Sequence, residues 1–243
     1  DGAVIFVRHA IPGEQCTIEV TSTGSSFNRA DVVSVTQPSE FRVQPPCQYA
    51  HRLGCGGCDF QHIAPAHQRD LKSDVITEQF ARIAKMDIEV DVEEVAGPLG
   101  WRTRCSAVTT KAGALGFYQA RSHKIIPVDD CRILVTEMRY AELAQRGAKG
   151  DQRIEISISN TGERTIATAN ARDESPLRIS DGPDVAHYTV GGNSFEVSQK
   201  SFWQSHKDAP RILTDAVLRY AQPREGDHVL DLYGGVGLFA ASF

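Results

Sequence analysis

Four of the six cysteines in this sequence have the spacing of ligands to one metal centre. Three lie in a glycine-rich loop, CQYAHRLGCGGC, and the fourth lies far downstream in PVDDC; they are Cys47, Cys55, Cys58 and Cys131. In CGGC, two thiolates separated by two glycines can turn toward the same metal, because glycine allows a tight backbone and leaves amides free to face sulfur. The pattern predicts a four-thiolate site.

Residue types alone leave the occupant of this site open. Four cysteines hold either an iron-sulfur cluster or a structural zinc ion. Zinc sites usually come as two close cysteine pairs, whereas here three cysteines cluster and one stands apart, which favours iron-sulfur without excluding zinc. Disulfides are disfavoured because the first residues, DGAVIFVRHAIPGE, lack the features of a secretory signal peptide.

A second motif with chemical potential is the stretch HVLDLYGGVGLF. Residues 227–232 predict a compact apolar strand that runs into a glycine-rich turn, where a nucleotide-like ligand can approach the backbone. Such turns serve NAD as well as S-adenosylmethionine. Asp231 at the end of the strand, followed by a G-x-G pair without the third glycine of the dinucleotide fingerprint, favours S-adenosylmethionine.

Charge is unevenly distributed along the chain. The net charge of -5 argues against a protein that coats nucleic acid through bulk positive charge. Residues 101–124 nevertheless contain five basic residues and no acidic one: Arg102, Arg104, Lys111, Arg121 and Lys124. This run can form a phosphate-facing surface, or a solvated face whose charge is balanced by Asp129 and Asp130.

The hydrophobic pattern predicts the elements that position these groups. Period-two alternation predicts strands over residues 4–7, 16–20 and 30–35, which indicate a small antiparallel barrel or sheet, and a further strand over 87–95. It also predicts three hairpins around glycine-containing turns, which pair residues 104–110 with 114–118, 153–159 with 164–169, and 186–190 with 194–197. Helical spacing predicts helices over 66–85, 137–148 and about 212–220. The pattern changes to strand–helix alternation near residue 200, which predicts a domain boundary there.

Composition places the chain among ordinary soluble proteins, with 41% hydrophobic and 23% charged residues. No apolar run approaches the roughly 20 residues that span a bilayer. We therefore expect no membrane partner and a cytoplasmic location.

Taken together, these motifs resemble the RNA (uracil-5-)-methyltransferases that carry an N-terminal TRAM domain and a four-iron four-sulfur (4Fe-4S) cluster. VIFVRHAIPGE, NRADVV and PSEFRVQPPC are similar to the later part of a TRAM domain, an OB-like barrel that binds RNA. CGGCDFQH is similar to the cluster loop of the family, and GWRTRC, GALGFYQARSHKIIPVDDC and SFWQSH are similar to later blocks. The resemblance covers nearly the whole chain.

The resemblance implies a multidomain α/β fold in three parts. Residues 1–45 would form a partial TRAM domain, an OB-like antiparallel β-barrel. Residues 46–198 would form a central α+β domain with the iron-sulfur loop. Residues 199–243 would begin a Rossmann-like methyltransferase domain, so that the chain is expected to be truncated at both ends.

The resemblance also implies site residues. Cys47, Cys55, Cys58 and Cys131 would bind the cluster, although Cys47 and Cys55 are farther apart in sequence than in many members. Gln204, Tyr233, Gly235 and Gly237 would hold S-adenosylmethionine, and Phe202 would lie near the target base. Leu238 stands where the family often has asparagine.

The implied reaction is methyl transfer from S-adenosylmethionine to carbon 5 of a uridine in rRNA or tRNA, by a protein that is expected to be a monomer. A cysteine thiolate adds to carbon 6, and a base later removes the proton at carbon 5. Both groups are expected beyond Phe243, so no catalytic residue is predicted within the chain and the chain alone should be inactive. The alternatives are a non-catalytic, metal-stabilised RNA-binding module and a zinc-stabilised NAD-dependent enzyme.

Overall fold

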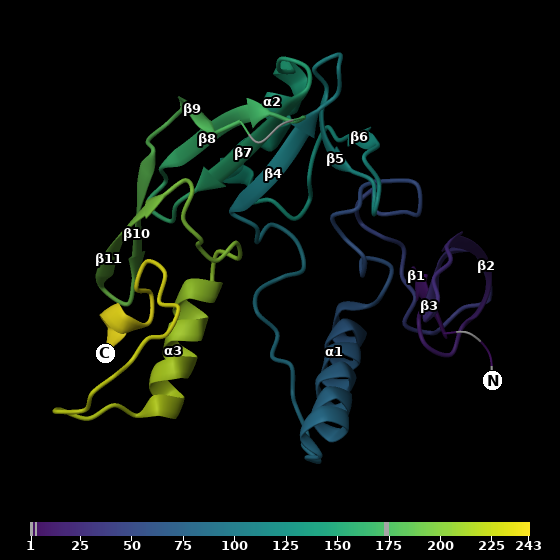
Figure 1. The fold of residues 1–243 in the computed structure, drawn as a ribbon, viewed down its shortest axis with the longest axis horizontal. Coiled ribbons are helices and arrows are strands. Elements are labelled where there is room, and N and C mark those ends of the chain that lie inside the picture. Colours follow the sequence, from purple (N-terminus) through teal and green to yellow (C-terminus); the bar gives the residue numbers. More distant parts are fainter. Residues whose placement is uncertain (1, 3, 173–174) are drawn as a thin grey trace. The chain divides into compact units, whose positions relative to one another are not determined.

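The computed structural model describes residue 2, residues 4–172 and residues 175–243 (Figure 1). The chain forms two compact units. The first unit contains the chain up to Glu94 together with Tyr118–Ile126, and the second contains Val95–Phe117 and Pro127–Phe243. The first unit is therefore discontinuous in sequence. The domain boundaries expected near residues 45 and 198 stay predictions.

A three-stranded sheet in the order β1-β3-β2 begins the first unit. Its strands are β1 (Val4–Arg8), β2 (Gln15–Ser22) and β3 (Phe27–Gln37). The antiparallel pairing of β2 with β3 was predicted, but β1 runs parallel to β3. Alternation along a strand does not specify the direction of its partner. Among the described residues these strands form an open sheet and no closed barrel.

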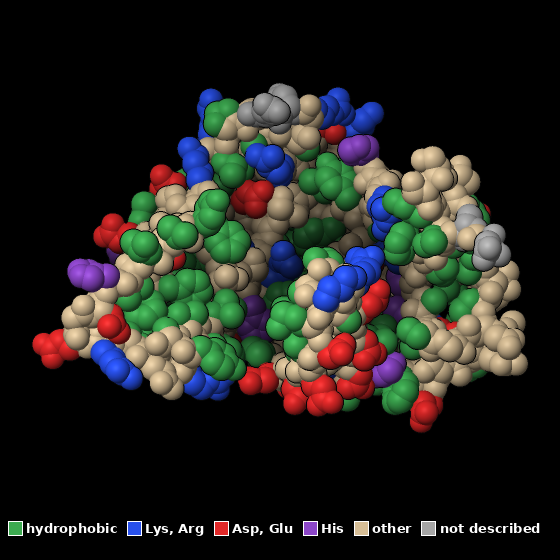
Figure 2. Space-filling model, turned by 60° about the horizontal axis from the view of Figure 1, so that its bottom comes forward, with side chains coloured by type: hydrophobic (Ala, Val, Ile, Leu, Met, Phe, Trp, Pro, Cys, Tyr) green, Lys and Arg blue, Asp and Glu red, His purple; other side chains and the backbone are tan. Residues whose placement is uncertain are grey.

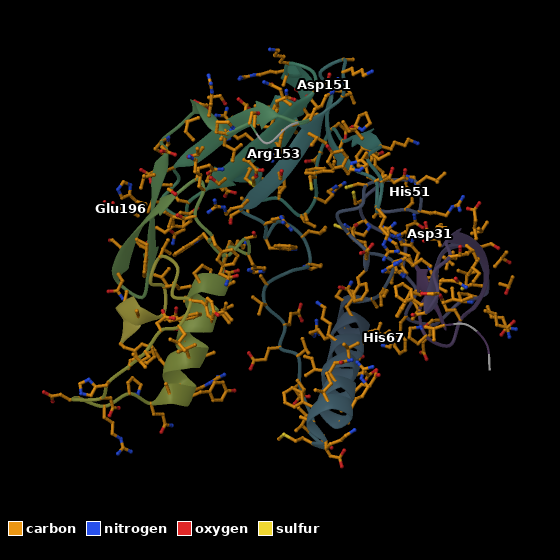
Figure 3. The ribbon with its side chains drawn as sticks, viewed as in Figure 1. Asp31, His51, His67, Asp151, Arg153 and Glu196 are labelled. Atoms are coloured by element: carbon orange, nitrogen blue, oxygen red, sulfur yellow. The ribbon has the colours of Figure 1, made fainter. Side chains whose placement is uncertain are left out.

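Helix α1 (Pro65–Gln79) continues as one π-helical turn, η1 (Phe80–Ala84), and confirms the helix predicted over residues 66–85. Pro65 stands at the start of the helix, where its missing N–H leaves no hydrogen bond unmade. Near this end the ring of His67, labelled in Figure 3, stacks on Phe41 with ring centroids 4.0 Å apart. No residue of α1 is buried, so the expected amphipathic helix presents its apolar residues to the surface of the unit.

The strand predicted over residues 87–95 is wrong, because this segment is irregular in the structure. It lies along α1, where the hydroxyl of Ser73 donates a hydrogen bond to the carbonyl of Val90 and Arg69 forms an ion pair with Glu94 at 3.3 Å. The alternation still describes burial: the acidic residues are exposed and the apolar ones half-buried. Figure 2 shows acidic side chains gathered in the lower middle of the view. A segment whose polar and apolar residues alternate does not become a β-strand unless another strand lies beside it to share hydrogen bonds.

The largest sheet has the strand order β6-β5-β4-β7-β8-β9. Its strands are β4 (Arg104–Thr109), β5 (Leu115–Tyr118), β6 (Ile125–Pro127), β7 (Gln152–Ile158), β8 (Arg164–Asn170) and β9 (Arg178–Asp181). Two of the three predicted hairpins lie in this sheet and are confirmed, with Thr109 opposite Leu115 and Ile158 opposite Arg164. Apolar side chains on β4, β7 and β8 are buried and form the core of the second unit.

The helix predicted over residues 137–148 is present in two parts. A short 3-10 helix, η2 (Thr136–Met138), is followed by α2 (Tyr140–Arg146). Arg139 separates them with a left-handed backbone, φ 53°. The Nε of Arg164 donates a hydrogen bond of 2.8 Å to the carbonyl of Met138, which ties this turn to β8.

The third predicted hairpin and a helix complete the second unit. β10 (Val185–Val190) and β11 (Asn193–Ser198) confirm the predicted pair, and α3 (Ala209–Ala221) confirms the predicted helix. Gly191 and Gly192 join the strands with φ angles of 59° and 87°, which residues with a Cβ rarely adopt. Within the described residues no helix is both long and apolar enough to cross a membrane.

The strand predicted over residues 227–232 is also wrong. These residues are irregular, and Leu230 and Leu232 are 85% and 77% exposed. A strand needs a neighbour for its N–H and C=O groups, and no described strand of the chain pairs with this segment. The residues after it end in a short 3-10 helix, η3 (Ala240–Ser242).

Candidate functional site

Two segments about a hundred residues apart in sequence lie side by side in the second unit. The N–H of Thr103 donates to the carbonyl of Ser205 at 2.7 Å, and the N–H of Lys207 donates to the carbonyl of Trp101 at 2.9 Å. The ring of Trp101 stacks on His206 with centroids 5.3 Å apart. The blocks GWRTRC and SFWQSH, which resemble separate motifs of one family, therefore form one structural element.

Trp203 fixes this element to the hairpin β10–β11. It is 4% exposed, and its ring lies 4.6 Å from Tyr188 and 5.6 Å from Phe195, centroid to centroid. Burial of aromatic rings of this size is the main stabilisation available to a short extended segment. Its neighbours differ: Phe202 is 76% exposed, whereas Gln204 is half-buried.

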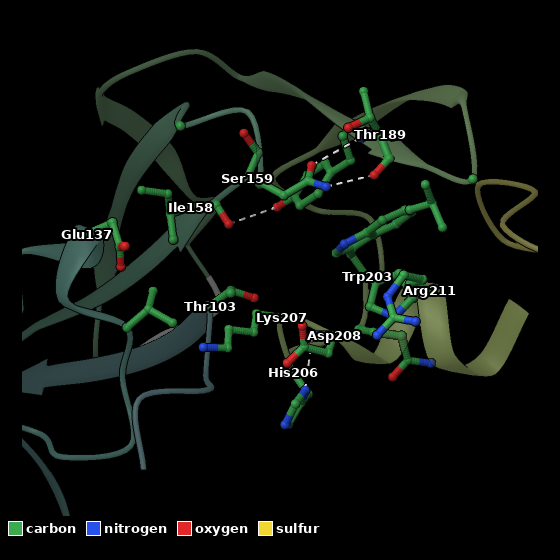
Figure 4. Close-up of a pocket in the computed structure, with 18 residues that line it drawn as sticks. Thr103, Glu137, Ile158, Ser159, Thr189, Trp203, His206, Lys207, Asp208 and Arg211 are labelled. Carbon is green, nitrogen blue, oxygen red and sulfur yellow. Dashed lines mark hydrogen bonds between the residues drawn. The ribbon is translucent and has the colours of Figure 1, made fainter. Parts of the chain in front are cut away.

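A cavity of about 470 Å³ opens beside this element (Figure 4). Its walls come from the segment just before β4, the turn between β7 and β8, β10, residues 203–208 and the start of α3. Residues that line it include Thr103, Asn160, Trp203, Gln204, Lys207 and Arg211. This volume suits a nucleoside-sized ligand. Of the residues predicted to hold the methyl donor, Gln204 lines the cavity.

One wall of the cavity is held by the side chain of Asn160. Its amide N–H donates to the carbonyl of Thr189 at 2.7 Å, and its Oδ1 accepts the N–H of Thr189 at 3.0 Å, the pair of bonds that a neighbouring strand would make. Nearby, hydrogen bonds from the N–H and ring of His187 lower the pKa of the Glu163 carboxyl. These contacts tie the β7–β8 turn to β10. The sequence indicated a turn at residues 160–162 but not the hydrogen bonds that this turn makes with β10.

Charges of both signs surround the cavity. Lys207 and Arg211 are balanced by the carboxylates of Glu137 and Asp208, and Arg211 also pairs with Asp215 at 3.0 Å. This balance favours a neutral or zwitterionic ligand over a polyanion. No described lining residue is a cysteine.

The glycine-rich turn does not line this cavity. Tyr233, Gly235 and Gly237 have left-handed backbones, and the side chain of Tyr233 is fully exposed. The turn is held by Asp231, whose Oδ2 accepts the N–H of Ala240 at 3.3 Å, and by the apolar residues that follow, which pack on the hairpin β10–β11. The shared role predicted for Gln204 and this turn stays a prediction, as does that of Phe202.

The cysteine-rich loop lies in the first unit and is bound to the tip of the hairpin β5–β6. The N–H of Gly56 donates to the carbonyl of Tyr118 at 2.9 Å, and a Cβ at Gly56 would lie 2.5 Å from the backbone nitrogen of Ala120. The glycine is needed for this close approach. Gly57 has more room, since a Cβ there would meet only the Sγ of Cys55, at 3.5 Å.

The surroundings of Cys55 shift the pKa of its thiol in both directions. Burial raises the pKa of the Cys55 thiol, the N–H of Gly57 lowers it, and neighbouring Cys58 and Cys47 raise it. Cys131 belongs to the second unit. Across the described parts of the chain, no three His, Cys, Asp or Glu side chains are grouped to hold a metal ion. The four-cysteine site stays a prediction.

Sequence comparison gives relatives that match nearly the whole chain. An uncharacterized RNA methyltransferase from Streptomyces coelicolor is 34% identical across the whole chain, which spans 60% of the relative. The 23S rRNA (uracil(1939)-C(5))-methyltransferase RlmD of Thiobacillus denitrificans is 29% identical over 98% of the chain, which spans 65% of that protein. The chain thus spans less than two thirds of these relatives. No protein-family model matches the sequence.

The comparison with solved structures also gives a methyltransferase. The fold matches the crystal structure of a Pyrococcus abyssi tRNA (uracil-54, C5)-methyltransferase in complex with S-adenosyl-L-homocysteine, with a TM-score of 0.67 and 18% identity. The match covers 97% of this chain and 65% of that one. In sequence the chain is similar to RNA methyltransferases, and in fold it is similar to a tRNA uracil methyltransferase.

Proposed function

We propose that this chain is part of an enzyme that transfers a methyl group from S-adenosylmethionine to carbon 5 of a uridine in RNA. The main support is the 34% identity with an RNA methyltransferase along the entire chain. The uracil specificity is supported by the RlmD relative and by the motif blocks in the sequence. Whether the RNA is ribosomal or transfer RNA does not follow from these observations.

The residues of the second unit suit the binding of the methyl donor. Gln204 offers an amide to a cavity of mixed polar and apolar lining, whose side chains of both charges suit the ammonium, sulfonium and carboxylate groups of the donor. Tyr233, Gly235 and Gly237 offer a turn whose backbone is open to a ligand. The donor supplies an activated methyl group, and these residues would bind and orient it.

The experiment is methyl transfer followed at the product. The protein is incubated with donor labelled in its methyl group and a uridine-containing RNA, the RNA is digested, and nucleosides are separated. We expect labelled 5-methyluridine from a longer polypeptide that includes the expected nucleophile, and none from residues 1–243 alone. Labelled product at any other nucleoside contradicts the proposal. RNA binding without any transfer by the longer polypeptide would favour the non-catalytic module instead.

We also propose that Cys47, Cys55, Cys58 and Cys131 hold a four-iron four-sulfur cluster. The proposal is supported by the thiolate donor set and by the N–H of Gly57, which donates to the Sγ of Cys55 at 3.4 Å. Such N–H···S bonds are common around iron-sulfur clusters.

Anaerobic purification tests this site without any activity assay. We expect a brown protein with about four irons per chain, as the cluster type requires. Cys58→Ser should lose the visible absorbance, whereas Cys16→Ser, the same change outside the predicted ligand set, should keep it. Bound zinc, or iron that is equally retained by Cys58→Ser, would contradict the proposal.

A further inference from the structure

We infer that the tip of the hairpin β5–β6, residues 118–126, forms with the cysteine-rich loop a surface that binds the backbone of single-stranded RNA. This inference rests on the proposed function for the choice of RNA as the partner. The surface lies wholly in the first unit. None of its residues is among those that line the cavity of the second unit, whose balanced charges do not suit a polyanion.

The structure divides the basic run of residues 101–124 into two groups. Arg102 and Arg104 are half-buried and already donate to carbonyl groups of the protein, Arg102 to Arg104 and Arg104 to Gln199, each at 2.9 Å. Lys111, Arg121 and Lys124 are exposed. The second group is exposed and has its cationic ends available for phosphate, and two of its three members lie at the hairpin tip.

The hairpin tip is a closed turn that holds its cations outward. The N–H of Gln119 donates to the carbonyl of Lys124 at 2.9 Å, and the N–H of Lys124 donates to the hydroxyl of Ser122 at 3.0 Å. Arg121 has a left-handed backbone, φ 52°. In the described chain no ion pair involves Arg121 or Lys124, so neither charge is neutralised within the protein.

Aromatic rings accompany these cations. Tyr118 is 38% exposed, and its ring meets that of His123 edge-on with centroids 6.1 Å apart. Exposed aromatic rings beside cations are the pattern of single-strand binding, because bases stack on the rings while phosphates meet the charges. A duplex would offer no unstacked bases to Tyr118.

The cysteine-rich loop holds the tip in place. Gly56 donates to the carbonyl of Tyr118, and Cys55 forms an isolated β-bridge with Gln119. The position of Arg121 and Lys124 therefore depends on the conformation of the cysteine loop. This link gives the loop a part in RNA binding that needs no redox chemistry.

The experiment measures RNA binding by the full chain, without methyl donor. A fluorescein-labelled single-stranded oligouridylate is titrated with protein at several salt concentrations, and binding is followed by anisotropy. The test variant is Arg121→Ala with Lys124→Ala. The control is Arg146→Ala with Lys149→Ala, which removes one Arg and one Lys with the same spacing, both exposed and neither in an ion pair among the described residues.

We expect the test variant to bind more weakly and to lower the slope of log K against log salt by about 1.4, since each phosphate contact with a single strand contributes about 0.7. The control variant should keep the wild-type slope, and so should Arg121→Lys with Lys124→Arg. Equal losses in test and control would overturn the inference in favour of bulk charge, and a wild-type slope in the test variant would overturn it outright. Because methyl transfer is measured separately, failure of this surface and failure of the proposed function are distinguishable.

Discussion

Replacing Gly56 by alanine should detach the cysteine-rich loop from the hairpin tip, whereas the same replacement at Gly57 should not. The added methyl group at Gly56 would lie 2.5 Å from the nitrogen and 2.7 Å from the Cα of Ala120, which are backbone atoms and cannot rotate away. At Gly57 the new Cβ meets only the Sγ of Cys55, at 3.5 Å, an ordinary van der Waals contact. The two changes are chemically identical and adjacent in sequence.

The expected sizes follow from these contacts. Overpacking of a rigid site costs about 1–3 kcal/mol, and Gly56→Ala also endangers the hydrogen bond to Tyr118. Replacing glycine by alanine returns about 0.4–1 kcal/mol by reducing the freedom of the unfolded chain. We therefore expect Gly56→Ala to destabilise the first unit by about 1–2 kcal/mol, and Gly57→Ala to leave it unchanged or slightly more stable.

The assay can separate the two units, because both tryptophans, Trp101 and Trp203, lie in the second. Tryptophan fluorescence during urea unfolding reports the second unit, and hydrogen exchange of amides in residues 47–58 and 118–126 reports the first. Gly56→Ala should speed exchange in both segments and leave the fluorescence transition in place. Unchanged exchange in Gly56→Ala, or an equal effect in Gly57→Ala, would refute the steric reasoning.

Three further outcomes follow from buried groups. Hydrogen bonds from Arg42 hold the pKa of the Glu14 carboxyl at about 2, below its ordinary 4.5, so the stability that they provide is present above pH 4.5 and is lost as pH falls toward 2. Glu14→Gln should remove this acid-dependent loss of stability, which is at most about 3 kcal/mol in urea titrations. Trp203→Ala should cost the second unit about 3–5 kcal/mol in urea unfolding followed by near-ultraviolet circular dichroism, because it empties the aromatic cluster; a loss below about 1 kcal/mol would contradict this packing. Burial raises the pKa of the Cys105 thiol to about 12, so a thiol reagent at pH 8 should modify it only after unfolding, and Cys105→Ser should remove that slow phase.

Hairpins were predictable because each combines two alternating segments with a turn that glycine favours. The turn through Gly191 and Gly192 and the turn through Gly162, φ 92°, are examples in which local sequence contains the whole signal. Helix α3 was predictable for the same reason, since its apolar spacing is local. These elements need no knowledge of distant partners.

The two wrong strands and the parallel pairing of β1 depend on which other segment lies beside each of them. Residues 87–95 alternate as a strand does, but their neighbour is α1, and Val90 accepts a hydrogen bond from the side chain of Ser73 instead of from a ladder. Residues 227–232 have strand composition and no described strand beside them. Composition and hydrophobic period describe one segment at a time and do not show which other segment pairs with it.

The sequence indicated one of the residues that line the cavity, but not the geometry of the cavity. The motif blocks indicated Gln204, and it lines the cavity. Nothing in the sequence indicated that Asn160 would replace a neighbouring strand for Thr189, because asparagine in a turn is common for other reasons. Side-chain bonds between distant segments form only once the sheet has brought them together.

The discontinuous first unit has a consequence for how this protein can be divided. The chain passes between the two units after Glu94, after Phe117 and again after Ile126. A gene fragment ending at Glu94 would encode the cysteine-rich loop without the hairpin tip that it binds, and a fragment starting at Val95 would carry that tip without its partner. Neither unit corresponds to one uninterrupted stretch of coding sequence, so recombination at a single point cannot exchange one unit and leave the other whole.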